Sequence, residues 1–312
     1  MPETSAPVRT ETPTPRESPR PRSHPSARPG RSGNRLWTAL LLPGTVWMTV
    51  FFLGALGILL LLSFGTTDDL GDPRFGHTLQ NLRALLHPVY LQVIGRSLAY
   101  AAITAVLCLA IAYPVAYAIA LHGGRFRHAL IAAVVVPFFA NYLVRMYGWV
   151  TLLSDDGPVL RALRALGLPA DVRLLNTPGA VIGGLVYGFV VFMVLPLYAA
   201  LERLDVSLIE AGRDLGGGPF STFWRVTLPA TRQGVTAGLL LVFLPAMGDF
   251  VSAQLLGGPR QLMIGSLIQD KFFGGQDWPL GSALTMLLML VLLICTSVYL
   301  RQAARENREA SR

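Results

Sequence analysis

A short polar segment between two long apolar stretches carries the residues best suited to ionic contact with a partner. Residues 210–212 read Glu-Ala-Gly, Gly216 follows after three residues, and residues 226–229, which read Val-Thr-Leu-Pro, come after nine more. Glu210 can pair with a basic residue of another protein or cap a helix, and small residues at 211 and 212 permit close backbone approach. We predict a docking hairpin here. A solvated loop that only connects two helices is the alternative.

The residues around this run predict a helix, a sharp turn and a second helix. The first helix is expected over 205–215, and the glycines at 216–218 end it because glycine accepts the left-handed conformation without a steric penalty. Pro219 suits the first turn of the second helix, where its missing N–H would have no partner anyway. Leu228 and Pro229 are expected to stop that helix before the next apolar stretch.

Asp249 is the second residue with chemistry of its own, because it is an acid within an apolar stretch. An ionisable group in a membrane span is costly and usually faces a cavity or a partner, and Pro245 and Gly248 would loosen the helix just before it. Three interpretations stay open. Asp249 lies on the pathway of a cationic solute, forms a structural pair with Arg145, or lies closer to the membrane surface.

Three further residues could contribute to such a pathway. Tyr147 and Phe250 offer ring faces for cation–π contact with ammonium groups, or else lie at the membrane interface as anchors. Asn141 offers an amide that contacts the solute or bonds to a neighbouring helix. Together with Asp249 and Arg145, these residues form the predicted substrate pathway.

Six apolar stretches must position these residues. Of 312 residues, 52% are hydrophobic and 14% are charged, whereas soluble domains carry about 25% charged residues. About 20 apolar residues in a helix are enough to cross a bilayer. The stretches lie at about 37–63, 97–121, 129–153, 180–201, 234–256 and 279–300. The sequence therefore predicts an all-α membrane protein with six transmembrane helices.

The distribution of Lys and Arg predicts the orientation of these spans. With the N-terminus inside, the inner segments hold 17 basic residues and the outer connections hold 7. This orientation places both termini and residues 202–232, which contain the docking hairpin, in the cytoplasm. The protein is expected to be a multi-pass component of the cytoplasmic membrane.

The chain is predicted to have a tail at each end of a membrane domain at 37–301. Residues 1–36 are rich in Arg, Pro and Ser and cannot bury enough apolar surface to fold, so a disordered cytoplasmic tail is predicted. Nucleic acid and anionic lipid both attract basic tails, but the position directly before an apolar helix favours membrane lipid. Residues 302–312 are predicted to form a short cytoplasmic C-terminal tail.

The sequence lacks the motifs of several chemistries. It contains no Gly-x-x-x-x-Gly-Lys-Ser/Thr run, so no phosphate-binding loop is expected. The five histidines have no partners at metal-ligand spacing, and Cys108 and Cys295 lie in apolar stretches. We therefore expect neither a metal site nor a cofactor on this chain, and no enzymatic activity. Any ATP and magnesium would be bound by a partner.

The hairpin spacing resembles the coupling loop, or EAA loop, of ATP-binding-cassette (ABC) importer permeases: Glu-Ala-Ala, three residues, Gly, nine residues and Ile-x-Leu-Pro. Gly212 and Val226 depart from two of these positions. Other segments resemble the first permease subunit of spermidine/putrescine importers and extend over nearly everything after residue 36. They are residues 79–82, 85–86, 137–139, 143–148, 196–198, 204–205, 245–248, 256–258, 263–265 and 277–283.

This resemblance implies the six-helix, MetI-like fold of type I ABC importer permeases. It also implies a second permease, two cytoplasmic ATPase subunits and an extracytoplasmic substrate-binding protein, which together import polyamines or a related small charged solute. It assigns contact with the ATPase to Glu210, Ala211, Gly212, Gly216, Leu228 and Pro229. The alternatives are an importer of opines or phosphonates and, from another class, an ion-coupled secondary transporter.

Overall fold

The structure is a computed structural model that describes residues 31–68, 72–167, 169, 172–275 and 277–310. Residues 1–30, most of the predicted N-terminal tail, lie outside the described residues. The chain divides into two units, Met1–Gly54 and Ala55–Arg312, and the boundary falls inside the first helix, α1 (Arg31–Ser63).

In the first unit, α1 begins at Arg31, earlier than the residue 37 that hydropathy predicts. The chain has no proline between Pro29 and Pro43, so nothing in that interval removes a helical hydrogen bond. The side chains of residues 41–54 are all exposed.

The second unit opens with a small antiparallel sheet of β1 (Thr66–Thr67) and β2 (Pro73–Arg74). Helical elements follow, in which η marks a 3-10 or π segment. They are α2 (Gln80–Ala84), α3 (Pro88–Tyr117), η1 (Ala118–His122), η2 (Gly124–Phe126), α4 (Arg127–Val135), η3 (Val136–Phe139), α5 (Tyr142–Leu153), α6 (Pro158–Ala165), α7 (Pro178–Glu202), α8 (Val206–Asp214), α9 (Pro219–Thr222), η4 (Phe223–Thr227), α10 (Leu228–Ala230), α11 (Arg232–Gly248), α12 (Val251–Leu256), η5 (Pro259–Gln261), α13 (Ile264–Gln269), η6 (Asp270–Gly274) and α14 (Trp278–Ala310).

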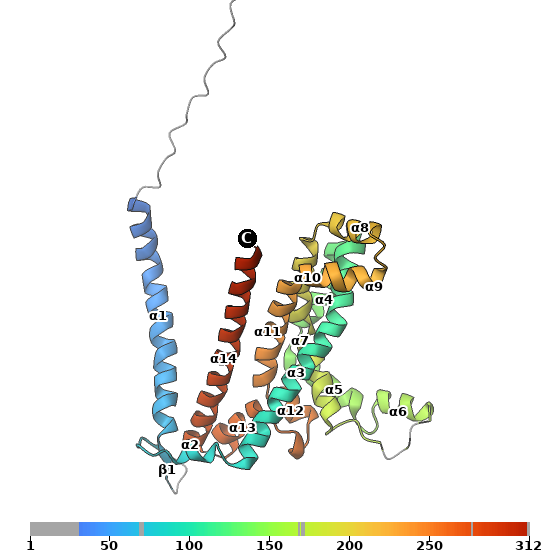
Figure 1. Ribbon diagram of the computed structural model, residues 1–312. Helices are drawn as coiled ribbons and strands as arrows, with labels where there is room; N and C mark the ends of the chain where they lie inside the picture. The colour runs from blue at the N-terminus through green and yellow to red at the C-terminus, as the bar shows by residue number, and fades with distance from the viewer. Residues whose placement is uncertain (1–30, 69–71, 168, 170–171, 276, 311–312) are drawn as a thin grey trace, which may run out of the picture. The chain divides into compact units, whose positions relative to one another are not determined.

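Three long helices, α3, α7 and α11, pack together at the centre of this unit (Figure 1). Their shared core contains Cys108 and Tyr113 of α3, Met193 and Leu197 of α7, and Val242 of α11. Glycines on α11 let it approach α7 closely, because small residues at membrane helix interfaces permit backbone contact.

Gly234 of α11 gives a test of this packing. A Cβ at this position would lie 2.6 Å from the Ala200 Cβ and 2.8 Å from the Pro196 carbonyl oxygen, so a larger residue must push α11 away from α7. We expect Gly234→Leu to destabilise the protein by about 3 kcal/mol, measured as a lower melting temperature of the detergent-solubilised complex. Gly95→Leu is the control, because no atom of the described residues lies within 4 Å of a Cβ at Gly95. Equal melting temperatures in the two variants would contradict the packing argument.

The number of membrane spans depends on how bent helices are counted. Four described helices are long and apolar enough to cross a membrane, and there are six if each of two bent pairs forms one span. In the first pair Gly124–Phe139 meets Tyr142–Ala165 at 88°, and in the second Pro219–Ala230 meets Arg232–Gly248 at 71°. The count of six therefore stays a prediction.

Two stretches predicted as continuous spans are interrupted. The stretch at 129–153 breaks at residues 140–141, after the 3-10 turn that contains Pro137. The stretch at 234–256 breaks at residues 249–250, where Asp249 takes an extended conformation after α11. Hydropathy does not detect these breaks because the broken segments are as apolar as continuous helices.

The last helix, α14, continues to Ala310, beyond the predicted boundary at residue 301. Apart from Asn307, residues 302–310 are Ala, Arg, Glu and Gln, which favour continued helix, and neither Gly nor Pro occurs there.

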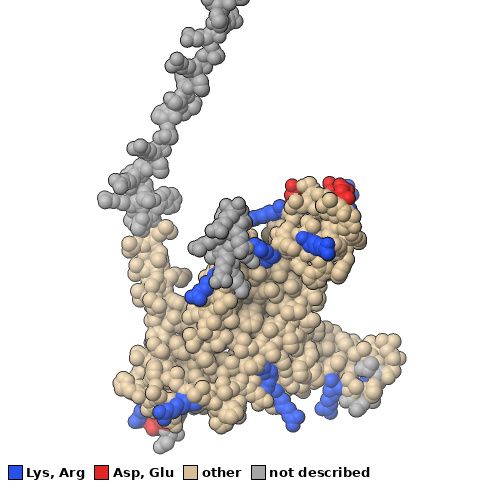
Figure 2. Space-filling model, viewed as in Figure 1, with Lys and Arg blue, Asp and Glu red and all other residues tan. Residues whose placement is uncertain are grey.

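Charged side chains of the second unit gather at the two ends of its helices. On the face seen in Figure 2, the band between these ends is almost free of them. This distribution suits helices that cross a hydrocarbon layer, where charges are costly.

Candidate functional site

The hairpin predicted within residues 202–232 forms at the end of α7, where Figure 1 shows α8, α9 and α10 close together. Asp205 caps α8, because its Oδ1 accepts a hydrogen bond from the Ser207 N–H at 3.0 Å. Hydrogen bonds from the backbone and the side chain of Ser207 hold the pKa of the Asp205 carboxyl below its usual value. The first arm of the hairpin is therefore anchored at its N-terminus by a local contact.

The turn between the two arms has the geometry that its glycines predict. Gly216 has φ of 83°, in the left-handed region. The Gly216 N–H donates to the Arg213 carbonyl at 2.9 Å and the Gly217 N–H donates to the Gly212 carbonyl at 3.1 Å. This pair of bonds is the Schellman ending of a helix. Pro219 then occupies the first turn of α9, as expected.

The second arm ends slightly later than expected. The helical segment continues through Pro229 to Ala230, and the chain bends before α11. Pro229 has no N–H to donate to the carbonyl four residues earlier, and the turn before it, η4, is a π-helix in which the Leu228 N–H reaches the Phe223 carbonyl. Proline therefore widens this helix, and the bend comes at Thr231.

The predicted coupling residues divide into exposed and internal groups. Glu210, Ala211, Gly216 and Pro229 are exposed, and Leu228 is half-buried. Gly212 faces the other arm of the hairpin instead of the surface, because a Cβ there would lie 3.2 Å from Val226 and 3.3 Å from Thr222. The small residue at 212 thus allows the two arms to pack together, whereas Ala211 is on the outside.

The hairpin also exposes large apolar side chains that the sequence analysis did not single out. Leu215 is 90% exposed, Phe220 76% and Trp224 53%. Apolar residues within a polar connecting segment are the signal that would have found them. Beside them a groove of about 810 Å³ extends along α3, lined by Tyr113 and other apolar residues of α3 and of the hairpin. An exposed apolar surface of this kind is typical of a protein contact.

A second cluster forms where two broken helices meet. The Tyr142 hydroxyl, at the start of α5, donates to Asp249 Oδ1 at 3.0 Å, and the Ser252 N–H donates to Asp249 Oδ2 at 2.8 Å. The Ser252 and Tyr142 hydroxyls lie 2.8 Å apart. Asp249 is 8% exposed, so this carboxylate is buried behind Tyr142 and stabilises the break before α12.

Asn141 lies at the other break. Its side-chain oxygen accepts from the Leu143 N–H at 2.9 Å and so caps α5, while the residue remains exposed. Asn141 thus bonds to its own helix, which was not one of the two predicted roles. It lies four residues before Arg145 and therefore on the same face of α5.

Arg145 and Asp249 form no ion pair among the residues that the structure describes. Instead, the Arg145 guanidinium carbon lies 4.9 Å from the ring centre of Phe138, 5.4 Å from that of Tyr142 and 5.6 Å from that of Tyr187. Its Nε is buried and has no hydrogen-bond partner in the described part of the chain. This aromatic cage was not predicted from the sequence: Tyr142 lies one turn before Arg145 on α5, whereas Tyr187 comes from α7, 42 residues later in the chain.

The two predicted aromatic residues of the pathway do not join the cage. Tyr147 is 60% exposed and lies two positions after Arg145, which turns it by about 200° around α5. Phe250 is 41% exposed at the break beside Asp249. The structure therefore connects Asp249 and Arg145 through Tyr142 and places Tyr147 on a different face.

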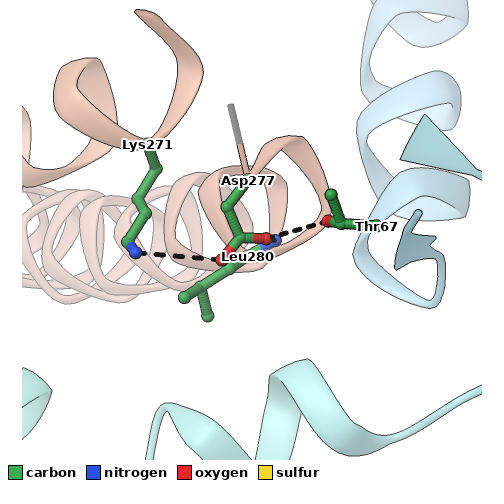
Figure 3. Close-up of polar contacts among 4 residues, drawn as sticks. All are labelled: Thr67, Lys271, Asp277 and Leu280. Atoms are coloured by element: carbon green, nitrogen blue, oxygen red, sulfur yellow. Dashed lines mark hydrogen bonds and ion pairs between the residues drawn. The ribbon is translucent and has the colours of Figure 1, made fainter. Parts of the chain in front are cut away.

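A carboxylate in the connection before α14 has a structural role. Asp277 Oδ1 accepts from the Thr67 hydroxyl at 3.3 Å and from the Leu280 N–H at 3.4 Å, and its Oδ2 lies 3.8 Å from Lys271 Nζ (Figure 3). It thereby caps the start of α14 and links β1 to η6. The only lysine of the chain is used in this contact.

Known proteins with similar sequences place these features in a family. Residues 112–309 match the binding-protein-dependent transport system inner membrane components. The chain belongs to this family. The permease is 41% identical over 264 residues to the spermidine/putrescine transport system permease protein PotB of Haemophilus influenzae, across 84% of this chain and 92% of that protein. It is 39% identical over 264 residues to PotB of Escherichia coli, across 84% and 96%.

Solved structures share the fold of the permease. A chain of the bacterial alginate ABC transporter, in complex with an alginate pentasaccharide-bound periplasmic protein, has a TM-score of 0.71 at 19% identity and covers 88% of this chain and 96% of that chain. A chain of the MetNI methionine ABC transporter has a TM-score of 0.54 at 16% identity, over 72% and 97%. The predicted all-α, MetI-like permease fold is confirmed. The permease is a multi-pass inner-membrane transport subunit, a class that is not itself enzymatic.

Proposed function

We propose that this permease, together with a second permease, forms the pathway by which an ABC importer takes up polyamines such as spermidine and putrescine. The observation that carries the proposal is the similarity to the PotB proteins, 41% identity over 84% of the chain in one case. The similarity extends over 92% of that relative, so it includes nearly the whole transport subunit.

The energy for this transport comes from a separate ATPase in this proposal. Two ATPase subunits bind ATP and magnesium in the cytoplasm and contact the hairpin, which is therefore cytoplasmic along with both termini. The exposed Glu210 and the exposed apolar residues Leu215 and Phe220 support a docking role, because together they provide a charge and an apolar surface.

The solute is delivered by an extracytoplasmic binding protein. The structurally similar alginate transporter was solved in complex with a periplasmic protein, and this supports such a partner. Inside the permease we place the solute beside the junction of Asn141, Arg145, Asp249 and Phe250, with Tyr147 on another face of α5. Asp249 is a buried carboxylate with no basic partner in the part of the chain that the structure describes, so it attracts a cationic solute, and half-exposed rings offer that solute cation–π contact.

Uptake into proteoliposomes tests the proposal. They would contain this permease, the second permease, the ATPase and the binding protein of the same system, with labelled putrescine outside and ATP inside. We expect uptake that requires both ATP and the ATPase. Uptake without the ATPase would indicate an ion-coupled secondary transporter. Stimulation of ATP hydrolysis by the binding protein without movement of putrescine would retain the importer and reject the polyamine, and competition by opines or phosphonates would then be measured.

A further inference from the structure

The cage around Arg145 is built from two regions of the chain, the bent pair that contains Arg145 and helix α7. Phe138 comes from η3, before the break in the bent pair, Tyr142 from the first turn of α5, and Tyr187 from the middle of α7. All three ring centres lie within 5.6 Å of the guanidinium carbon. This is the distance range of cation–π attraction, so the cage is a site that holds a positive charge.

The guanidinium is held there with few other contacts. Its Nε is buried without a hydrogen-bond partner, and no carboxylate of the described residues forms an ion pair with Arg145. A guanidinium carries five N–H donors and is normally bonded to acceptors when it is buried. Arg145 is therefore a weakly held occupant of the cage.

The cage is also accessible and lies beside a negative charge. Tyr187 is 40% exposed, and Asn141, on the same face of α5 as Arg145, is exposed. Tyr142 contributes its ring to the cage and its hydroxyl to Asp249. A phenol that donates to a carboxylate is polarised by it, which strengthens the attraction between its ring and a cation.

We propose that this aromatic cage is a binding site for an ammonium group of the solute, and that Arg145 occupies it only while the solute is absent. This inference rests on the proposed polyamine substrate. The entering ammonium displaces the guanidinium, so the cage holds one positive charge in both states. Phe138, Tyr142 and Tyr187 bind the ammonium, and Arg145 acts as a tethered competitor.

A direct binding measurement shows whether Arg145 competes with the solute for the cage or binds the solute itself. Equilibrium binding of labelled putrescine would be measured on the solubilised complex of the two permeases and the ATPase, without the binding protein. We expect Arg145→Gln to lower the Kd by roughly threefold to thirtyfold, because it removes the guanidinium that competes for the cage by cation–π attraction. In the Arg145→Gln background, Tyr187→Leu is expected to reverse the gain, because the cage loses a ring.

Two variants serve as controls. Arg145→Lys keeps a tethered cation and should therefore gain less affinity for putrescine than Arg145→Gln. Tyr299→Leu makes the same aromatic-to-aliphatic change on α14, which contributes no ring to the cage, and should leave the gain of Arg145→Gln intact. Size-exclusion profiles and basal ATP hydrolysis show whether each variant is folded, and Tyr187→Leu alone, which should weaken binding, provides a second test if Arg145→Gln does not fold.

The opposite result in Arg145→Gln would overturn the inference. Weaker binding of putrescine, or no change, would mean that Arg145 is not a competitor. An anionic solute would need Arg145 as its ligand and would lose binding in this variant. If the wild-type system fails to take up putrescine, the proposed function is wrong. If it takes up putrescine and Arg145→Gln does not bind it more tightly, only the cage inference is wrong.

Discussion

Replacing Glu210 with Arg is expected to abolish ATP-dependent uptake while the permease still folds and inserts. Glu210 is exposed on α8 and forms no ion pair among the described residues, so its carboxylate is available to a basic residue of the ATPase. Charge reversal turns that attraction into repulsion. Loss of one partner of a docked charge pair costs about 2–5 kcal/mol, so docking should weaken by about thirtyfold or more.

Two measurements check this expectation: co-purification of the ATPase with the permeases, and putrescine uptake in the same preparations. Glu210→Gln, which removes the charge without reversing it, should have an intermediate effect. Asp156→Arg is a matched reversal at an exposed acid of the connection after α5 and should keep uptake. Normal ATPase co-purification with Glu210→Arg would show that Glu210 is not a docking residue.

Removal of the charge of Asp249 should have the second largest effect. Asparagine retains an oxygen that can accept from Ser252 N–H or Tyr142 hydroxyl, so Asp249→Asn removes the charge and preserves much of the helix break. We expect putrescine uptake to fall about tenfold to hundredfold, the effect of losing an interaction with a charged group of about 1.5–3 kcal/mol. ATP hydrolysis should be retained, because the hairpin is unchanged.

Two further variants, Asp249→Ala and Asp277→Asn, distinguish an effect of the Asp249 charge on the solute from an effect on the stability of the helix break. Alanine leaves the Tyr142 hydroxyl and the Ser252 N–H without their acceptor, so Asp249→Ala should also lower the yield of folded complex. Asp277→Asn makes the same chemical change at another helix-capping carboxylate and should retain most uptake. If Asp249→Asn transports like the wild type and only Asp249→Ala fails, Asp249 stabilises the break and does not act on the solute.

The local features of the hairpin were predicted from sequence because short-range rules determine them. Gly216 adopts the left-handed conformation and Pro219 starts a helix, and both follow from the stereochemistry of single residues. The apolar stretches likewise identified the helices, since about 20 apolar residues in succession have few stable arrangements other than a membrane helix.

The breaks inside two of these helices were not predicted. Asp249 was recognised as an unusual residue, and Pro245 and Gly248 as loosening the helix, but the carboxylate at the break also accepts from the Tyr142 hydroxyl, more than a hundred residues earlier in the chain. Hydropathy averages over a window and cannot register a hydrogen bond between distant segments. The pair of Asp249 with Arg145, one of three interpretations that the sequence left open, does not form among the described residues, where Asp249 bonds to Tyr142 and Ser252.

The sequence by itself determined the class of protein: apolar stretches, the hairpin and its spacing, and the overall resemblance to importer permeases. Tertiary structure alone decided which side of Gly212 is covered, where α11 ends, and that Tyr187 of α7 joins the rings around Arg145. The physical reason is the range of the interactions. Turns, caps and hydropathy act between near neighbours in the chain, whereas packing, buried hydrogen bonds and cation–π contacts join residues that only the fold brings together.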